Sequence, residues 1–205
     1  MKKIGCCIGI PRAASKTLYE NLDYGYALKF TIEEHPIIFE NHQILRLTEK
    51  AFDLSNVFVF TVVRHPYDRV ISWYFFHKQW KEEPYNTLSF DEWIKEGCPH
   101  HWTIQSGFNW KKENKSPLLQ YNFIEGSERS VDFIGKVENL STDLPYILDR
   151  LNKILESNNL SHRFKYNNDR FNYSARPKDL TLNQEQKDLV YNLFKKDFDY
   201  FGYDP

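Results

Sequence analysis

The sequence predicts an α/β protein in three layers, with a central parallel sheet flanked by helices. Segments with strand character alternate with segments of helical periodicity, which is the pattern of parallel βαβ units. Residues 57–63, VFVFTVV, are apolar almost throughout, as expected of a central strand covered on both faces. No internal repeat and no linker rich in Gly and Ser divides the 205 residues. We therefore expect a single domain over residues 1–205.

The chain begins with a strand and a helix. The first expected strand covers residues 3–10, an apolar run that ends at Pro11. The first expected helix covers residues 15–24, in which Leu18 and Leu22 lie four apart and share a face.

A second strand and a second helix are expected next. A strand at 26–34 would place Phe30 and Ile32 on one face. Asn41 would then cap a helix over residues 42–52. The apolar stripe of that helix would be formed by Ile44, Leu45, Leu47 and Ala51.

The second half of the chain continues the alternation of helices and strands. Its expected elements are helices at 66–80 and 89–96, a strand at 131–137, and helices at 143–157 and 183–198. An irregular insertion at about 78–130 interrupts this pattern, and we expect it to determine specificity, because loops vary freely.

Composition and charge exclude several classes of protein. The formal net charge is −1, so no basic surface for nucleic acid is expected. No apolar run of about 18 residues predicts a membrane span, and the N-terminus shows no signal-peptide core. We expect a cytoplasmic protein. The chain has three cysteines: Cys6, Cys7 and Cys98. Their spacing is not that of metal ligands, so we expect no metal site and interpret all three as buried thiols of a protein in a reducing compartment.

The turn between the first strand and the first helix carries the residue types of a phosphate site. The first turn of a helix presents backbone N–H groups to an anion, and small side chains let the anion approach. Arg12 and Lys16 add charge. The loop consists of Arg12, Ala13, Ala14, Ser15, Lys16 and Thr17. It is not a Walker A loop, since it has no glycine. An ordinary capped helix with two solvated cations is the alternative.

A second candidate anion site follows the strand at 57–63. Arg64 lies at the carboxyl end of that strand, where ligands bind in open α/β sheets. Ser72 lies two turns into the next helix, on the side that could face Arg64. Arg69 is better interpreted as structural, paired with Asp68 or a neighbouring carboxylate. Two anion sites after two parallel strands suggest a nucleotide with phosphates at both its 3′ and 5′ positions.

These segments resemble the sulfotransferase family. IPRAASKTL (10–18) resembles the 5′-phosphosulfate loop, P-K-x-G-[ST]-[ST]-x-L, and VVRHPYDRVISWY (62–74) resembles the 3′-phosphate motif, R-x-P-x-x-R-x-x-S-x-Y. VDFIGKVENLSTDL (131–144) and KKDFDYFGYD (195–204) are similar to two later segments of the family. The four matches stand in family order, and carbohydrate-type and bacterial members are the most similar. The resemblance implies a P-loop-like version of the three-layer fold.

The resemblance also implies an activity. The donor would be 3′-phosphoadenosine 5′-phosphosulfate (PAPS), with PAP as product, no metal, and a hydroxyl of a saccharide or other small molecule as acceptor. Arg12 and Lys16 would stabilise the departing phosphate, while Arg64 and Ser72 would hold the 3′-phosphate. Three residues depart from the family pattern. Arg12 replaces Lys, Lys16 replaces a hydroxyl residue, and Ala14 replaces Gly, which should restrict the loop to negative φ.

A base is needed for the acceptor proton. His42 is our first choice, since bacterial relatives have a similar His there, and a helix start would favour its neutral form. His35, which precedes Pro36 at a strand end, is the second choice.

Two further groups are expected around the substrates. In the insertion, His101, Trp102 and Gln105 suit stacking on sugars and hydrogen bonding to them. Before the last helix, the loop with Ser174, Arg176 and Lys178 resembles the basic loop with which the family covers the nucleotide. Ordinary surface loops are the alternative for both groups.

Two other functions remain open from the sequence. A nucleotide kinase or other phosphoryl transferase would need Mg²⁺ and a carboxylate near the first loop, yet the strand at 57–63 ends in Arg64, where such an enzyme would place Asp. A nucleotide-binding module without catalysis is the third hypothesis, and the altered first loop favours it.

Overall fold

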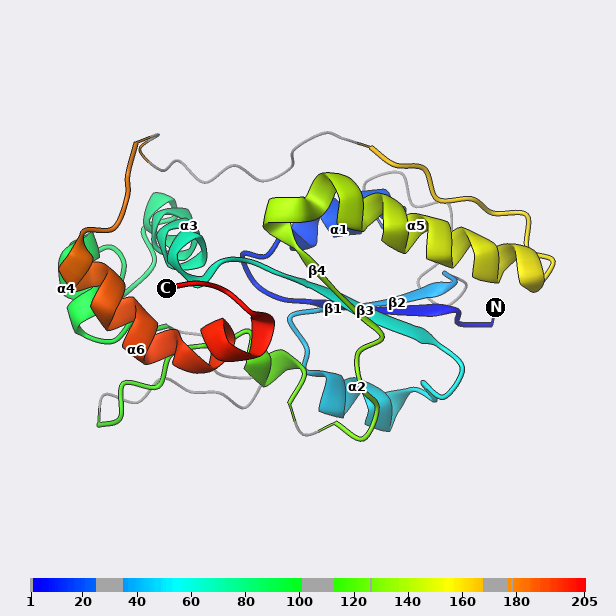
Figure 1. Cartoon of the computed structure of the whole chain (residues 1–205), viewed down its shortest axis with the longest axis horizontal. Helices are drawn as coiled ribbons and strands as arrows, with labels where there is room; N and C mark the ends of the chain where they lie inside the picture. The colour runs from blue at the N-terminus through cyan, green and yellow to red at the C-terminus, as the bar shows by residue number, and fades with distance from the viewer. Residues whose placement is uncertain (1, 25–34, 101–112, 126, 168–176, 178) are drawn as a thin grey trace. The chain divides into compact units, whose positions relative to one another are not determined.

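Four parallel strands form one sheet in the order β2-β1-β3-β4 (Figure 1). The computed structural model describes residues 2–24, 35–100, 113–125, 127–167, 177 and 179–205. The strands are β1 (Gly5–Gly9), β2 (Ile37–Asn41), β3 (Phe58–Val63) and β4 (Phe133–Lys136). The helices are α1 (Ser15–Asn21), α2 (Leu45–Ala51), α3 (Pro66–Gln79), α4 (Phe90–Lys95), α5 (Leu140–Ser157) and α6 (Gln184–Phe201), with short 3₁₀ turns at Tyr121–Phe123 and Val137–Asn139.

The contacts within the chain divide it into two compact units. The sheet unit comprises Met1–Val63 and Phe123–Asn172, and the helical unit comprises Arg64–Asn122 and Tyr173–Pro205. The expected single domain over residues 1–205 stays a prediction.

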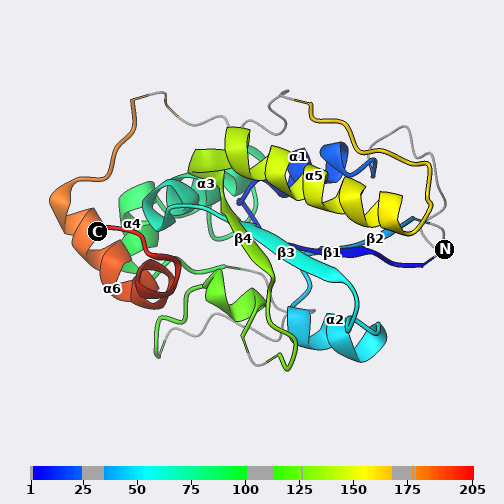
Figure 2. The same ribbon diagram turned by 45° about the vertical axis from the view of Figure 1, so that its right-hand side comes forward.

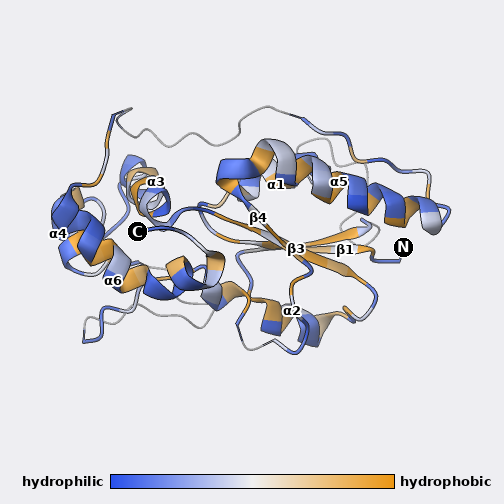
Figure 3. Cartoon of the chain, in the orientation of Figure 1, coloured by the Kyte–Doolittle hydropathy of each residue, from blue (hydrophilic) through white to orange (hydrophobic). Residues whose placement is uncertain are grey.

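Helices cover both faces of the sheet within the sheet unit. Helices α1 and α5 lie on one face and α2 lies on the other (Figures 1 and 2). Strands β1 and β3 are buried at every position, and Figure 3 shows the strands as largely hydrophobic. The hydroxyl of Thr61 in β3 donates to the carbonyl of Ile8, 2.6 Å away, so the polar group in this strand is satisfied. The predicted parallel sheet flanked by helices is therefore confirmed.

One apolar cluster holds α1 and α5 against the sheet. The helices contribute Leu18, Leu22, Leu144, Ile147, Leu148, Leu151 and Leu155, and the strands contribute Cys7, Ile37, Phe58, Phe60 and Val62. Burying one such side chain contributes about 1.5–3 kcal/mol. All three cysteines are free and buried, as predicted.

The region between β1 and β3 departs from the sequence prediction. The strand expected at 26–34 lies outside the described residues. Strand β2 instead covers Ile37–Asn41, and it pairs with β1 from Gly5↔Ile37 to Gly9↔Asn41. Asn41 therefore ends a strand and does not cap a helix. Helix α2 begins at Leu45, with Ile44 as an N-cap that has no side-chain bond. Pairing with β1 overrides the local capping signal.

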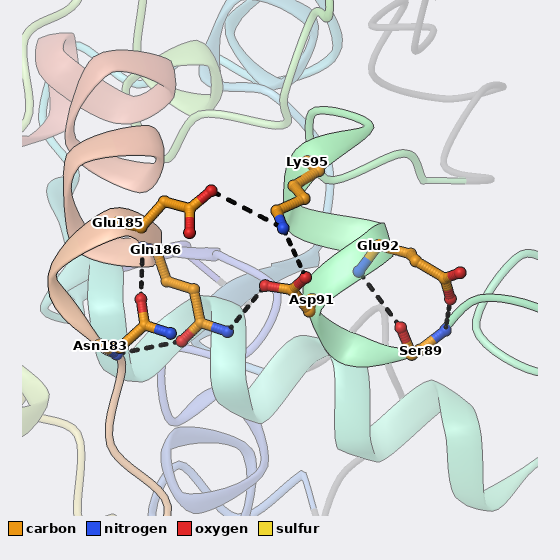
Figure 4. A network of polar contacts seen from close by, with 7 residues as sticks. All are labelled: Ser89, Asp91, Glu92, Lys95, Asn183, Glu185 and Gln186. Carbon is orange, nitrogen blue, oxygen red and sulfur yellow. Dashed lines mark hydrogen bonds and ion pairs between the residues drawn. The ribbon is translucent and has the colours of Figure 1, made fainter.

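The helices of the helical unit begin where the sequence predicts. Pro66 occupies the first turn of α3, and capping boxes begin α4 at Ser89 and α6 at Asn183. Figure 4 shows how α4 and α6 are joined: Gln186 Nε2 donates to Asp91 at 3.3 Å, and Lys95 lies 3.7 Å from the Glu185 carboxylate. The helical unit also buries large aromatic side chains: Trp73, Tyr74, Tyr85, Trp93, Phe194 and Phe198.

Among the described residues, no helix has both the length and the apolar character that crossing a bilayer requires.

Candidate functional site

The loop between β1 and α1 contains two residues in the left-handed region of backbone conformation. Arg12 has φ 64° and Ala14 has φ 59° and ψ 19°. The expectation that Ala14 restricts the loop to negative φ is therefore wrong. The carbonyl of Ile10 accepts hydrogen bonds from the N–H of Ala13 at 3.2 Å and the hydroxyl of Ser15 at 2.6 Å. These bonds close a tight turn from strand to helix, and the turn forces Ala14 into a conformation that usually selects Gly.

The polar side chains of this loop are engaged within the sheet unit. The hydroxyl of Ser15 donates a hydrogen bond to the carbonyl of Ile10, and Thr17 is buried on α1. Lys16 extends along α1, where its ammonium lies 2.5 Å from the Glu20 carboxylate. An (i, i+4) pair at a partly exposed position contributes only about 0.3–0.5 kcal/mol, so a phosphate group can compete for Lys16. Arg12 is half-buried.

His42 lies at the same edge of the sheet as this loop. It directly follows β2, and its N–H donates to the carbonyl of Gly9, the last residue of β1, at 2.9 Å. Its φ is 71°. Since α2 begins only at Leu45, the helix-start argument for a neutral imidazole does not apply.

Glu40, two residues before His42, is a half-buried carboxyl group that sequence reasoning missed. Its burial raises its pKa. The apolar residues before it in the segment IIFEN are a strand signal that could have placed it, but the sequence prediction set the second strand at 26–34.

The structure does not bring His35 to this edge. His35 precedes β2, at the end of the sheet where Lys3 donates to its carbonyl at 2.8 Å. Its ring is fully buried, and its centroid lies 3.9 Å from that of Tyr24. The N–H of Ile37 donates to Nδ1 at 3.1 Å. Burial lowers the pKa of His35 to about 4, so this ring is a neutral core group.

Arg64 is the first residue after β3 and belongs to the helical unit. The fully buried side chain of Gln120 contacts its backbone twice. Gln120 Oε1 accepts from the Arg64 N–H and Nε2 donates to the Arg64 carbonyl, both at 2.8 Å. Ser72 is buried on α3. His65 caps α3, and its Nδ1 accepts from the N–H of Tyr67.

Arg69 has a structural role, as the sequence suggested. Its Nη1 donates to the carbonyl of Leu118 at 2.7 Å, and its guanidinium lies 5.3 Å from the ring centre of Trp73. Burial lowers the pKa of Arg69 to about 10, and the Asp197 carboxylate limits that fall. The carboxylate that faces Arg69 thus comes from α6.

Gln120 and Asp197 are polar residues of the core that sequence reasoning missed. Asp197 is fully buried, and its carboxylate accepts from the N–H groups of Gln120 at 2.8 Å and Tyr121 at 2.9 Å. Burial raises the pKa of Asp197, while Arg69 opposes this rise. One signal was present for Asp197: it lies on the apolar stripe of α6, between Phe194 and Phe198. Gln120 had no such signal.

Six of the expected site residues lie outside the described part of the chain. They are His101, Trp102, Gln105, Ser174, Arg176 and Lys178. Within the described ranges, no group of three or more His, Cys, Asp or Glu side chains forms a metal-binding cluster.

Comparisons with known proteins identify the family. A family model described as the sulfotransferase family matches residues 9–204. A protein of Archaeoglobus fulgidus, described only as an uncharacterized protein, is 33% identical over 106 residues, which are 52% of this chain and 75% of that protein. The family match runs from the last residue of β1 to the C-terminal segment, so it includes the loop at 12–17, Arg64 and Ser72. The chain belongs to the sulfotransferase family.

Proposed function

We propose that this protein transfers a sulfuryl group from PAPS to a hydroxyl of a saccharide or another small acceptor and releases PAP. Membership of the family establishes sulfuryl transfer in general. The donor, the acceptor class and the roles of individual residues are our proposal. In it, the loop at 12–17 binds the 5′-phosphosulfate, and Arg64 and Ser72 bind the 3′-phosphate.

The strand order is the observation that carries this proposal. Strands β1 and β3 are parallel neighbours, with Ile8 opposite Thr61, so their carboxyl ends lie at one edge of the sheet. The chain continues from β1 into the cationic loop and from β3 directly into Arg64. Ligands of open α/β sheets bind at this edge. Two cationic segments that leave adjacent strand ends suit a donor with a phosphate at each end.

The chemistry requires three things of the protein. The acceptor oxygen attacks sulfur in line with the bond from sulfur to the bridging oxygen of the 5′-phosphate, and that bond breaks. The acceptor hydroxyl loses its proton to a base. The leaving 5′-phosphate of PAP gains negative charge, which Arg12 and Lys16 would stabilise as Lys16 exchanges Glu20 for the phosphate.

His42 is the proposed base. It follows β2 at the edge where the loop begins, and its N–H is fixed to Gly9 of β1. Imidazole takes up a proton near neutral pH, which suits a general base.

The test is transfer of labelled sulfate from PAPS to a library of glycans and small alcohols, with PAP release measured in parallel. We expect His42→Ala to lower turnover by about 10²–10⁴-fold. Its affinity for PAP, which is adenosine 3′,5′-bisphosphate (3′,5′-ADP), should be unchanged. His162→Ala, which removes a histidine paired with Asp23, is the matched control and should retain turnover. Normal turnover in His42→Ala contradicts the base assignment. A wild-type protein that neither binds 3′,5′-ADP nor releases PAP contradicts the donor.

A further inference from the structure

Arg64 lies in the short turn between β3 and α3, where its backbone belongs to neither element. The strand ends at Val63 and α3 begins at Pro66. Backbone polar groups in such turns need partners from elsewhere in the chain. Gln120 supplies them: one amide group accepts from the N–H and donates to the carbonyl of the same residue, both at 2.8 Å. This pair of bonds fixes the position and the rotation of the Arg64 peptide groups.

Gln120 is itself held by buried charges. Asp197 accepts from the N–H groups of Gln120 and Tyr121, and Arg69 donates to the carbonyl of Leu118. Helices α3 and α6 therefore clamp the backbone on both sides of Gln120. These hydrogen bonds are shielded from water, because each of the four side chains is at most 3% exposed: Leu118, Gln120, Arg69 and Asp197.

We infer that Gln120 is a positioning residue for Arg64, and that it presets the Arg64 guanidinium for the 3′-phosphate of the donor. This inference rests on the proposed function, in which Arg64 binds that phosphate. A guanidinium binds phosphate through two parallel N–H donors, and this geometry tolerates little displacement. A backbone fixed in advance also lowers the ordering that binding requires. Gln120 thus raises the affinity for the 3′-phosphate through Arg64, without contacting the phosphate itself.

The test compares two nucleotides that differ only in the 3′-phosphate. Calorimetry gives the dissociation constants of 3′,5′-ADP and 5′-AMP, and their ratio reports the contribution of the 3′-phosphate. In Gln120→Met, which keeps the side-chain length and removes both bonds, we expect this ratio to fall by about tenfold with the 5′-AMP affinity unchanged. Arg64→Met should lower the ratio by about 10–100-fold, and the double variant should lose no more than Arg64→Met alone.

Two further variants separate positioning from general stability. Val190→Ala removes a buried methyl pair from α6 in the same unit and should lower the melting temperature without changing the ratio. Gln120→Leu also removes both bonds to Arg64 and adds no charge near the phosphate, so its ratio should fall as in Gln120→Met. If Gln120→Met does not fold, Gln120→Leu carries the test against Val190→Ala.

The outcomes distinguish this inference from the proposed function. A wild-type protein that prefers 3′,5′-ADP, together with an unchanged ratio in the folded Gln120 variants, overturns the inference alone. Equal losses of both affinities in those variants also overturn it, because they indicate a structural role only. A wild-type protein with no preference for 3′,5′-ADP overturns the proposed function and the inference with it.

Discussion

Replacing Ala14 by Gly should stabilise the protein, although Ala→Gly changes usually destabilise. Ala14 has φ 59° and ψ 19°, a left-handed conformation that costs an L-residue about 1–2 kcal/mol. Glycine removes that penalty. It also gives the unfolded chain more conformational entropy, which lowers the free energy of unfolding by about 0.5–1 kcal/mol. We expect Ala14→Gly to raise the free energy of unfolding by up to about 1.5 kcal/mol, and the melting temperature by up to about 6 °C.

Ala51→Gly is the matched control for this prediction. Ala51 is an exposed residue of α2 in the same unit and has no positive φ. This control should lower the free energy of unfolding by about 0.5–1 kcal/mol. Because both variants change the unfolded chain equally, the difference between them isolates the left-handed penalty, about 1–2 kcal/mol. Urea unfolding followed by tryptophan fluorescence measures both. Equal destabilisation by the two changes would refute the reasoning.

Two further predictions concern buried titratable groups. Burial lowers the pKa of His35 from 6.5 to about 4, so between these values the unfolded chain binds a proton that the folded chain does not, and stability falls as pH falls. The advantage of wild type over His35→Phe in unfolding free energy should therefore shrink by up to about 2 kcal/mol between about pH 7 and 5; a constant advantage across this range contradicts the buried, neutral ring. Burial raises the pKa of the thiols of Cys6, Cys7 and Cys98, so the native protein at about pH 8 should react with no thiol reagent until urea is added; rapid reaction of any native thiol would be the contrary result.

Most of the fold followed from local signals in the sequence. The apolar run of β3 and the capping residues Ser89 and Asn183 each specify their element without help from distant residues. Strand β2 did not follow, because its identity depends on pairing with β1 about thirty residues earlier. Asn41 is a plausible cap by composition, and only the sheet shows that it ends a strand.

The sequence indicated candidate cationic residues but not the groups that hold them in place. His42 was expected to open a helix, whereas the structure places it directly after β2, with its N–H bonded to Gly9 of β1. The φ of Ala14 follows from the closure of the turn by Ile10, which residue types alone do not reveal. The bonds of Gln120 to Arg64 and Asp197 join residues 56 and 77 positions apart, and no local pattern encodes such pairs.

The most direct test of the account is whether Arg12 and Arg64 bind opposite ends of one nucleotide. Calorimetry with 3′,5′-ADP, 5′-AMP and 3′-AMP on wild type, Arg12→Met and Arg64→Met answers this. The account predicts that wild type binds 3′,5′-ADP most tightly. Arg12→Met should then bind 3′,5′-ADP little better than 3′-AMP, and Arg64→Met should bind it little better than 5′-AMP. If either variant keeps the full wild-type preference for 3′,5′-ADP, the two arginines do not share one donor.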